Sequence, residues 1–320
     1  MELFRTTNID WLGKKWYFLG FSLIFSVAGV LSMAFWHGVP RGVDFKGGTL
    51  VYVKFDSTPN EDHLRQAIDA GGIHDASIQR ISGALGQVAN EEVISLPESS
   101  AADTSHDAGR ERVLAALNNN YHDSHFEVQQ VEIVGPTAGK QLQKQAWLAT
   151  IYSLIGMLVY LWFRFELIYG VAAVVAVFHD TLITVGAFSL TNQEITLTVI
   201  AAILTLIGYS MNDTIVVFDR IRENLALSRR ESLTDVVNRS INQTLSRTVI
   251  ASGLTFLTVL SLYLFGGEVL HGFSFALVVG ILIGTYSSIA VAAPMLVAYQ
   301  DWRASKGKAA TLPAGKRAKS

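Results

Sequence analysis

Long runs of apolar residues constrain this chain more than any other feature of its sequence. Four of them contain no Asp, Glu, Lys or Arg, at residues 16–40, 145–163, 248–267 and 269–300. Two more, 165–193 and 195–218, are interrupted only by Glu166, Asp180 and Asp213. A helix needs about 20 apolar residues to cross a bilayer. The pattern therefore predicts six transmembrane helices, at about 16–36, 144–163, 167–189, 195–217, 248–266 and 271–298.

The composition fits a membrane protein and excludes several kinds of site. Charged residues make up 16% of the 320 residues, whereas soluble proteins usually have about 25%. The chain has no cysteine, which excludes disulfides, thiolate metal sites and a cysteine nucleophile. The first apolar run is too long for a typical signal-peptide core, although Ser32-Met33-Ala34 resembles a cleavage site. We therefore expect this run to be an uncleaved membrane anchor.

The basic residues predict the orientation of the helices. Lys and Arg are frequent before the first span, between the fourth and fifth spans and after the sixth, whereas loops 190–194 and 267–270 have none. Basic short loops stay in the cytoplasm, so both termini are predicted to be cytoplasmic. We expect these segments: a cytoplasmic N-terminus (1–15), helix 1 (16–36), an exported domain (37–143), helices 2–4 (144–217), a basic cytoplasmic loop (218–247), helices 5 and 6 (248–298) and a basic cytoplasmic tail (299–320).

The exported segment has the pattern of a small α+β domain. Alternating or β-rich stretches predict strands at 49–55, 76–82, 91–97 and 126–135, and two further stretches predict helices at 60–72 and 105–120. The order β-α-β-β-α-β is that of a ferredoxin-like fold. His122 and His125 lack a third metal ligand and are interpreted as surface residues. No nucleophile–base pair or phosphate loop is found in the sequence, so we do not expect an enzyme.

Two carboxylates inside the apolar runs are the candidate functional residues. Ionisable residues in a membrane are costly and usually face the interior of the helix bundle or water. Asp180 lies near mid-bilayer, with His179 pointing about 100° away on a helix. Asp213 lies about 10 Å from the cytoplasmic face, within reach of Arg247 at the start of the fifth span. One interpretation is a fixed Asp213–Arg247 pair that joins two helices, and the other is a carboxyl that takes up and releases a proton.

Two weaker patterns concern packing. In the cytoplasmic loop, Ser232 and Asp235 resemble a capping box, and an apolar stripe follows them at helical spacing. We expect this segment to form a helix lying in the membrane interface. Small residues beside Asp213 and in Gly280-x-x-x-Gly284 predict close helix contacts.

Several motifs resemble the SecF subunits of the bacterial Sec protein translocase, which belong to the resistance-nodulation-division superfamily. The similarity covers residues 10 to 300 and includes the following motifs in the expected order: "GVDFKGGT" (42–49), "VEIVGPTAGKQL" (131–142), "FRFE" (163–166), "HDTLIT" (179–184), "IGYSMNDTIVVFDRIREN" (207–224), "NQTLSRT" (242–248) and "LYLFGG" (262–267).

The resemblance implies a fold, partners and roles for particular residues. The fold would be six transmembrane helices with a ferredoxin-like exported domain between helices 1 and 2. The partners would be SecD, the SecYEG channel, SecA, YajC, membrane lipid and a translocating polypeptide, without nucleic acid. The chain would use the proton gradient of the bacterial inner membrane, with the proton as coupling ion and no cofactor. The implied proton path contains Asp213, Arg247 and Asp180, and the implied helix or partner contacts are Gly208, Tyr209, Asn212, Asp219 and Arg220.

Two alternatives remain open from the sequence. One is half of an exporter for small molecules or lipids from the same superfamily, although such chains usually contain two large exported domains. The other is a structural scaffold for a channel, in which Asp213 and Arg247 form a static pair and proton coupling is absent.

Overall fold

The structure is a computed structural model that describes residues 7–74, 76–81, 90–97, 108–165, 167–228 and 231–306. Within these ranges, six helices are long and apolar enough to cross a membrane, which confirms the predicted number. Glu166, Arg229, Arg230 and most of the basic tail contributed to the sequence predictions but lie outside the described residues.

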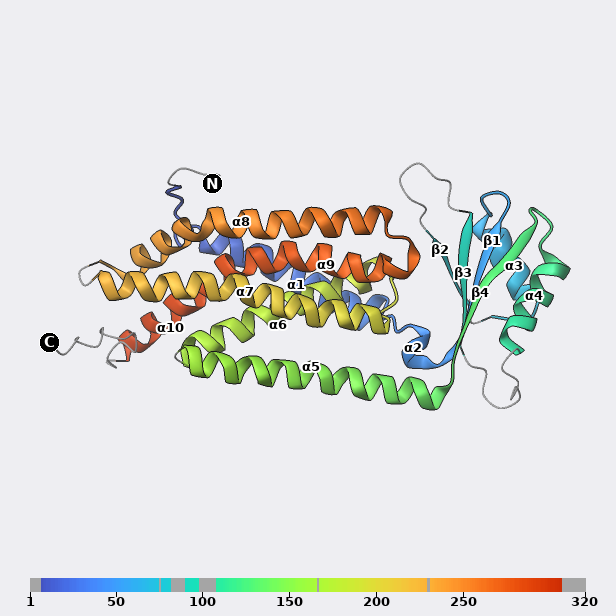
Figure 1. Cartoon of the computed structure of the whole chain (residues 1–320), viewed down its shortest axis with the longest axis horizontal. Coiled ribbons are helices and arrows are strands. Elements are labelled where there is room, and N and C mark those ends of the chain that lie inside the picture. Colours follow the sequence, from blue (N-terminus) through green and yellow to red (C-terminus); the bar gives the residue numbers. More distant parts are fainter. Residues whose placement is uncertain are drawn as a thin grey trace.

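The helices form one bundle, and the sheet domain lies at one of its ends (Figure 1). The first span consists of α1 (Lys15–Leu31) and the π-helical η1 (Ser32–Trp36). The next four are α5 (Pro136–Arg164), α6 (Leu167–Thr191), α7 (Leu197–Leu227) and α8 (Leu233–Phe265). The last combines α9 (Glu268–Ser287), the π-helical η2 (Ser288–Ala292) and α10 (Ala293–Ser305). The segment before α1 and the end of α10 lie at the end of the bundle opposite the sheet (Figure 1).

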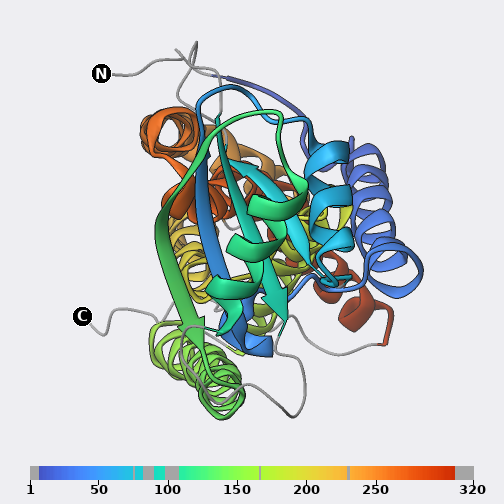
Figure 2. The same cartoon turned by 90° about the vertical axis from the view of Figure 1, so that its right-hand side faces the viewer.

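The domain between α1 and α5 is ferredoxin-like, as predicted. Its described strands are β1 (Gly48–Phe55), β2 (Ser77–Ile81), β3 (Glu91–Pro97) and β4 (Phe126–Val134), in the antiparallel order β2-β3-β1-β4. Helices α3 (Glu61–Ala70) and α4 (Ala108–Asn120) cover the sheet face that points away from the bundle (Figure 2). The alternating residues Val51, Val53 and Phe55 of β1 are buried against these helices. The short helix α2 (Val43–Lys46) lies between the sheet and the bundle (Figure 1).

Helix α9 is the centre of the bundle, because it packs against α6, α7 and α8. The two glycines of Gly280-x-x-x-Gly284 permit its close approach to α7. A Cβ atom at position 280 would come within 2.4 Å of Leu206, and one at position 284 within 2.9 Å of Ser210 Cβ. The close helix contact predicted for this motif is confirmed, and it brings α9 against the part of α7 that precedes Asp213.

At the end of the bundle opposite the sheet, α7 and α8 extend beyond the apolar runs. α7 continues to Leu227, and α8 begins at Leu233 with the predicted cap, since the Asp235 amide donates to Ser232 Oγ at 3.2 Å. The prediction of a separate interfacial helix was wrong. α8 continues without a break into the apolar run, and the stripe residues Val236 and Ile241 are completely buried in the protein.

Candidate functional site

Asp213 lies on the face of α7 that points into the bundle, and only 3% of the residue is exposed. Ser252 Oγ on α8 donates a hydrogen bond to Asp213 Oδ2 at 2.7 Å. The site is about 24 Å along α7 from its first residue, Leu197, because a helix rises about 1.5 Å per residue. The carboxylate is therefore deep in the bundle, where an unpaired charge is costly.

Arg247 is the basic residue nearest to Asp213 along α8, but the two do not form an ion pair. Arg247 precedes Ser252 by five residues, which places it about 7.5 Å nearer the end that holds the termini. It interacts electrostatically with Asp213. Among the described residues, however, none of the ion pairs, defined by N–O distances up to 4.0 Å, joins these two. In this structure the Arg247 side chain is exposed and makes no ion pair with Asp213, and both interpretations of the two residues stay predictions.

Two further buried hydroxyl groups lie on α8 and α9, the helices that pack against α7. Thr285 of α9 interacts with the Asp213 carboxylate, and Thr248 lies one helical turn before Ser252 on α8. The hydroxyl oxygens of Thr248 and Thr285 are buried and have no hydrogen-bond partner within 3.5 Å. A hydroxyl group can donate or accept a hydrogen bond. The site is therefore able to satisfy either the charged or the protonated form of the carboxyl.

A small apolar cavity of about 340 Å³ lies beside this site. Ser252 and Thr285 contribute to its lining, together with Phe18 of α1 and Phe256 of α8. The two hydroxyl-bearing residues next to Asp213 therefore lie between the carboxylate and an apolar hollow.

Asp180 is the second buried carboxylate, and its surroundings differ. Its Oδ2 atom accepts hydrogen bonds from Ser210 Oγ at 2.5 Å and Ser287 Oγ at 2.8 Å. His179 Nδ1 lies 3.0 Å from Asp180 Oδ1. The expectation that His179 points away from Asp180 was wrong, because its Nδ1 atom lies within hydrogen-bond distance of the Asp180 carboxylate. Asp180 thus joins α6 to α7 and to the end of α9, next to the π-helical η2.

The residues expected at a helix or partner interface fall into two groups. On α7, Gly208 and Asn212 are exposed, and Tyr209 is half-buried, with its hydroxyl donating to Thr255 Oγ1 at 3.0 Å. Thr205 and Ala201 continue the exposed stripe toward the sheet domain. The stripe is small and partly polar, and helix interfaces in membranes have this composition.

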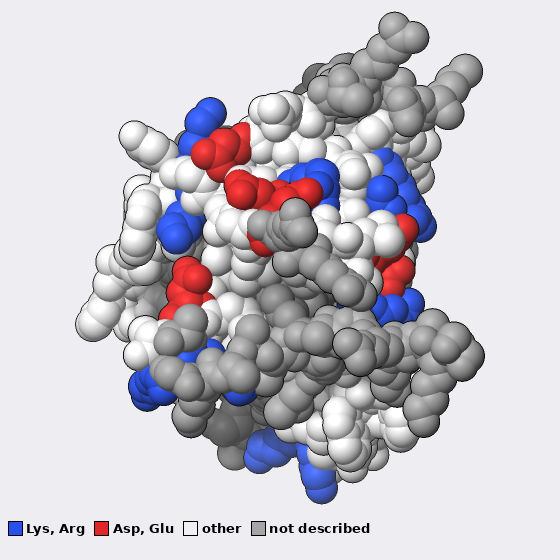
Figure 3. Space-filling view, turned by 90° about the vertical axis from the view of Figure 1, so that its left-hand side faces the viewer, with Lys and Arg blue, Asp and Glu red and all other residues white. Residues whose placement is uncertain are grey.

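Asp219 and Arg220 instead make contacts inside the chain. Asp219 Oδ1 accepts hydrogen bonds from Arg164 at 2.8 Å and Arg222 at 3.0 Å, which ties the α5–α6 turn to α7. Arg220 bonds to Glu223 and to Gln243 of α8, both at 2.7 Å. Figure 3 shows basic and acidic side chains together on this end of the molecule. The motifs around residues 164, 220 and 243 therefore brace neighbouring helices.

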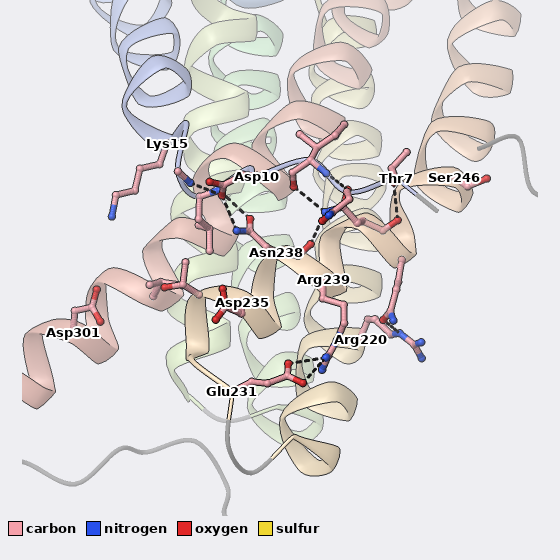
Figure 4. Close-up of a pocket in the computed structure, with 18 residues that line it drawn as sticks. Thr7, Asp10, Lys15, Arg220, Glu231, Asp235, Asn238, Arg239, Ser246 and Asp301 are labelled. Carbon is pink, nitrogen blue, oxygen red and sulfur yellow. Dashed lines mark hydrogen bonds and ion pairs between the residues drawn. The ribbon is translucent and has the colours of Figure 1, made fainter. Parts of the chain in front are cut away.

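At the same end, the segment before α1 crosses α8 beside a polar hollow of about 1140 Å³ (Figure 4). Two asparagines, one turn apart on α8, hold this segment. Asn242 Oδ1 accepts from the Ile9 amide at 3.0 Å, and Asn238 Oδ1 accepts from the Leu12 amide at 3.0 Å. Hydrogen bonds from the Gly13 amide and Asn238 lower the pKa of Asp10 below its usual value.

Sequence reasoning identified both carboxylates but missed their hydrogen-bond partners. Ser210, Ser252 and Ser287 are neutral residues within apolar runs, where Ser and Thr are common. The spacing of Thr248 and Ser252 was a partial signal for a polar face on α8. The two residues are four positions apart, so they share one face of the helix.

Comparisons with known proteins are consistent with the motifs. The family described as "Protein export membrane protein SecD/SecF, C-terminal" matches residues 113–302, and the "SecD/SecF GG Motif" family matches residues 37–59. A protein translocase subunit SecF of Koribacter versatilis is 54% identical, with 97% of this chain and 96% of that protein covered. A SecF of Calditerrivibrio nitroreducens is 43% identical, with 95% and 98% covered.

Two solved structures of SecDF are also similar. One is the crystal structure of a translocon-associated membrane protein from Thermus thermophilus, with 36% identity and a TM-score of 0.81 over 92% of this chain. The other, SecDF in a super-membrane-facing form, has 36% identity and a TM-score of 0.68 over 96% of this chain. The chain spans 39% and 40% of the lengths of those longer chains.

Proposed function

Because the chain belongs to the SecD/SecF family of protein-export membrane proteins, we propose that it uses the proton gradient to promote polypeptide export. Its role in the Sec translocase is accessory, as the SecF relatives indicate. In this proposal it works with SecD beside the SecYEG channel, with SecA and YajC as further components of the assembly. The coupling ion is the proton, and the chain needs no cofactor.

The surroundings of Asp213 are the observation that carries the proposal. A buried carboxylate holds one hydrogen bond from Ser252, while the cation nearest to it along α8, Arg247, is exposed and out of contact. Burial favours the protonated form of a carboxyl, and an approaching guanidinium favours the charged form. Movement of the long Arg247 side chain toward or away from Asp213 would therefore change the proton affinity of this carboxyl.

The protonated state has its own hydrogen-bond partners. A carboxyl group that has taken up a proton can donate to the hydroxyl of Ser252 or Thr285, and both hydroxyls are able to accept. The two states thus differ in the position of Arg247 and in the direction of a hydrogen bond between α7 and α8. Each proton cycle would shift these two helices relative to each other.

The exposed stripe of α7 supports a second membrane subunit as partner. Asn212 is polar and exposed, although it lies one residue before the buried Asp213 in the middle of a span. A polar amide facing lipid lacks hydrogen-bond partners, so a neighbouring protein surface is the favoured contact. In the proposal this surface belongs to SecD, and the termini face the cytoplasm because the basic residues gather at their end.

The partner proposal is tested by crosslinking. The native chain has no cysteine, so single cysteines at Gly208 or Asn212 have no competing thiol in this subunit. We expect crosslinks from both positions to SecD and none from Leu254, which is exposed elsewhere on α8. Crosslinks only to a second copy of this chain would contradict the proposal.

The coupling proposal is tested by export in membrane vesicles with and without an imposed proton gradient. Vesicles that contain this chain and SecD should show gradient-dependent stimulation, which vesicles lacking the chain should not show. Equal stimulation in both preparations would contradict proton coupling through this subunit. Transport of a small molecule without polypeptide export would instead support the exporter alternative.

A further inference from the structure

The segment that leads from α1 into the sheet domain is bonded directly to the start of α7. Pro40 O accepts from the Ile195 amide at 2.7 Å, and the Gly42 amide donates to Ile195 O at 3.0 Å. These two bonds form an isolated parallel bridge between residue 41 and residue 195. We call residues 40–47 the root of the sheet domain.

Asp44 adds a side-chain bond to the helix itself. The first amide of α7, that of Leu197, donates to Asp44 Oδ2 at 2.7 Å. The first amides of a helix have no partner within the helix, and its N-terminus carries a partial positive charge, so a carboxylate is well suited to this position. Thr196 Oγ1 accepts from the amide of Val199, also in the first turn, at 3.4 Å. Asp44 is therefore a cap supplied by a segment distant in the sequence, whereas Thr196 is the local cap.

A second carboxylate links the same place to the sheet. The pKa of Glu194 lies above its usual value, mainly because the carboxyl is buried, and the nearby Asp44 adds to this effect. Lys46 of the root and a hydrogen bond from Ser77 of β2 act in the opposite direction. Glu194 therefore lies among Lys46, Asp44 and Ser77, at the point where the bundle meets the sheet. Its Oε2 atom would be 3.4 Å from a Cβ atom at Gly42.

The opposite side of the root rests on α5. A Cβ atom on Gly139 would lie 3.1 Å from the Gly47 amide nitrogen and 3.2 Å from Phe45 O, so the backbones of α5 and the root approach closely. The root is thus held between the beginning of α5 and the beginning of α7. α7 is continuous from Leu197 through Asp213, and a movement at the carboxylate therefore reaches the root along one rigid element.

We propose that Asp44 is a positioning residue that fixes the root of the sheet domain to α7, so that displacements of α7 at Asp213 move the exported domain. The inference rests on the proposed proton cycle at Asp213 and adds the element that transmits it. It assigns a mechanical role to the motif around Gly47-Gly48, in which Asp44 is the bonded side chain. Pro40 and Gly42 contribute through their main chains and cannot be tested as simply.

The test compares three variants of the full chain assembled with SecD. Asp44→Ala removes the acceptor, whereas Asp44→Asn keeps an oxygen that can accept from the Leu197 amide. Asp56→Ala is the matched control, because Asp56 is an exposed aspartate of the sheet domain away from the root. We expect Asp44→Ala to lose most of the gradient-dependent stimulation while its gradient-free export and its binding to SecD stay normal. Asp44→Asn should restore the stimulation, and Asp56→Ala should equal the wild type.

A distance measurement provides a readout that a purely structural cap would not change. Spin labels at Ser57 and Thr191, both exposed, report the position of the sheet domain relative to the bundle. We expect Asp213→Asn, which imitates the protonated carboxyl, to shift the distance distribution in the wild-type background and not in the Asp44→Ala background. The same shift in both backgrounds, or no shift in either, would overturn the inference.

The outcomes separate this inference from the proposed function. If Asp213→Asn abolishes the gradient response and Asp44→Ala leaves it intact, Asp44 does not transmit the movement, while the proton site stands. If Asp213→Asn leaves the response intact, the proton site itself is wrong. Equal defects in Asp44→Ala and Asp44→Asn would show that the hydrogen bond to α7 is not the cause, which also overturns the inference.

Discussion

The two buried carboxylates of the bundle, Asp180 and Asp213, lie in the same helical core and have different surroundings. The Asp180 carboxylate contacts three side chains, Ser210, Ser287 and His179, at 2.5 to 3.0 Å. Asp213 has a hydrogen bond from Ser252, an unpaired Thr285 hydroxyl beside it and an arginine out of contact. A carboxylate with a complete set of donors stabilises one arrangement, whereas an incomplete set leaves room for a change of state.

Glu92 in the sheet domain shows what a fixed buried pair looks like in this protein. Glu92 is fully buried, and Arg80 Nε donates to its Oε1 atom at 3.0 Å. The guanidinium of Arg80 contacts the Glu92 carboxylate, whereas the guanidinium of Arg247 does not contact the Asp213 carboxylate. Burial of a charged group therefore does not by itself identify a proton carrier, and the position of the cation is the informative difference.

The largest effect is expected for Asp213→Asn. Asparagine has nearly the same shape and can hydrogen-bond to Ser252, but it cannot ionise. Gradient-dependent export in vesicles should be abolished, while co-purification with SecD stays normal. Asp62→Asn, on the exposed surface of the sheet domain, is the control and should behave as the wild type. Full gradient-dependent stimulation with Asp213→Asn would show that Asp213 does not carry the proton, and Asp180 would become the next candidate for this role.

Substitutions of Asp180 should act mainly on stability. Asp180→Leu removes the partner of the Ser210 hydroxyl and of His179 Nδ1, whereas the Ser287 hydroxyl keeps a bond to Gly284 O, and each unsatisfied group costs about 1–3 kcal/mol. We expect a loss of at least about 2 kcal/mol for Asp180→Leu and about 1–2 kcal/mol for Asp180→Asn, which keeps one acceptor. Thermal unfolding in detergent measures this loss. Normal stability combined with loss of the gradient response in Asp180→Asn would assign a proton role to this residue as well.

Ser252→Ala should give an intermediate result. The variant removes the hydrogen bond from Ser252 Oγ to Asp213 Oδ2. A loss of about 1.4 kcal/mol corresponds to a rate about tenfold lower, and a hydrogen bond to a charged group is worth about this amount. We therefore expect roughly tenfold slower gradient-dependent export. Ser261→Ala, at an exposed position on α8, should leave the rate unchanged, and an equal effect of both variants would argue against a specific role of Ser252.

The smallest effect concerns Glu92 and the pH dependence of stability. Burial raises the pKa of Glu92, and this effect exceeds the lowering by Arg80. The folded state therefore keeps its proton to higher pH than the unfolded chain, so the free energy of unfolding falls as pH rises from the unfolded pKa through the folded pKa. Glu92→Gln should remove this decline, which urea unfolding of the sheet domain between pH 4 and pH 8 would detect. An identical pH profile in both proteins would show that Glu92 does not titrate in this way.

Most of the architecture could be predicted from local patterns. Apolar runs identified the spans because the bilayer sets their length, and alternating patterns identified the strands because successive side chains of a strand face opposite sides. The helix cap at Ser232 was correct, while the interfacial helix after it was wrong. That stripe resembles a membrane-surface helix in sequence, and the bundle buries Val236 and Ile241 instead.

The sequence by itself determined that Asp180 and Asp213 are buried in a membrane bundle, since charges in apolar runs have few other places to lie. Only the tertiary structure decided their partners, because Ser252 is 39 residues from Asp213 and Ser287 is 107 residues from Asp180. It also placed Asp44 on the amide of a helix that begins 153 residues later. Hydrogen-bond partners depend on which helix faces meet, and packing of distant segments sets this, whereas hydrophobicity along the chain does not.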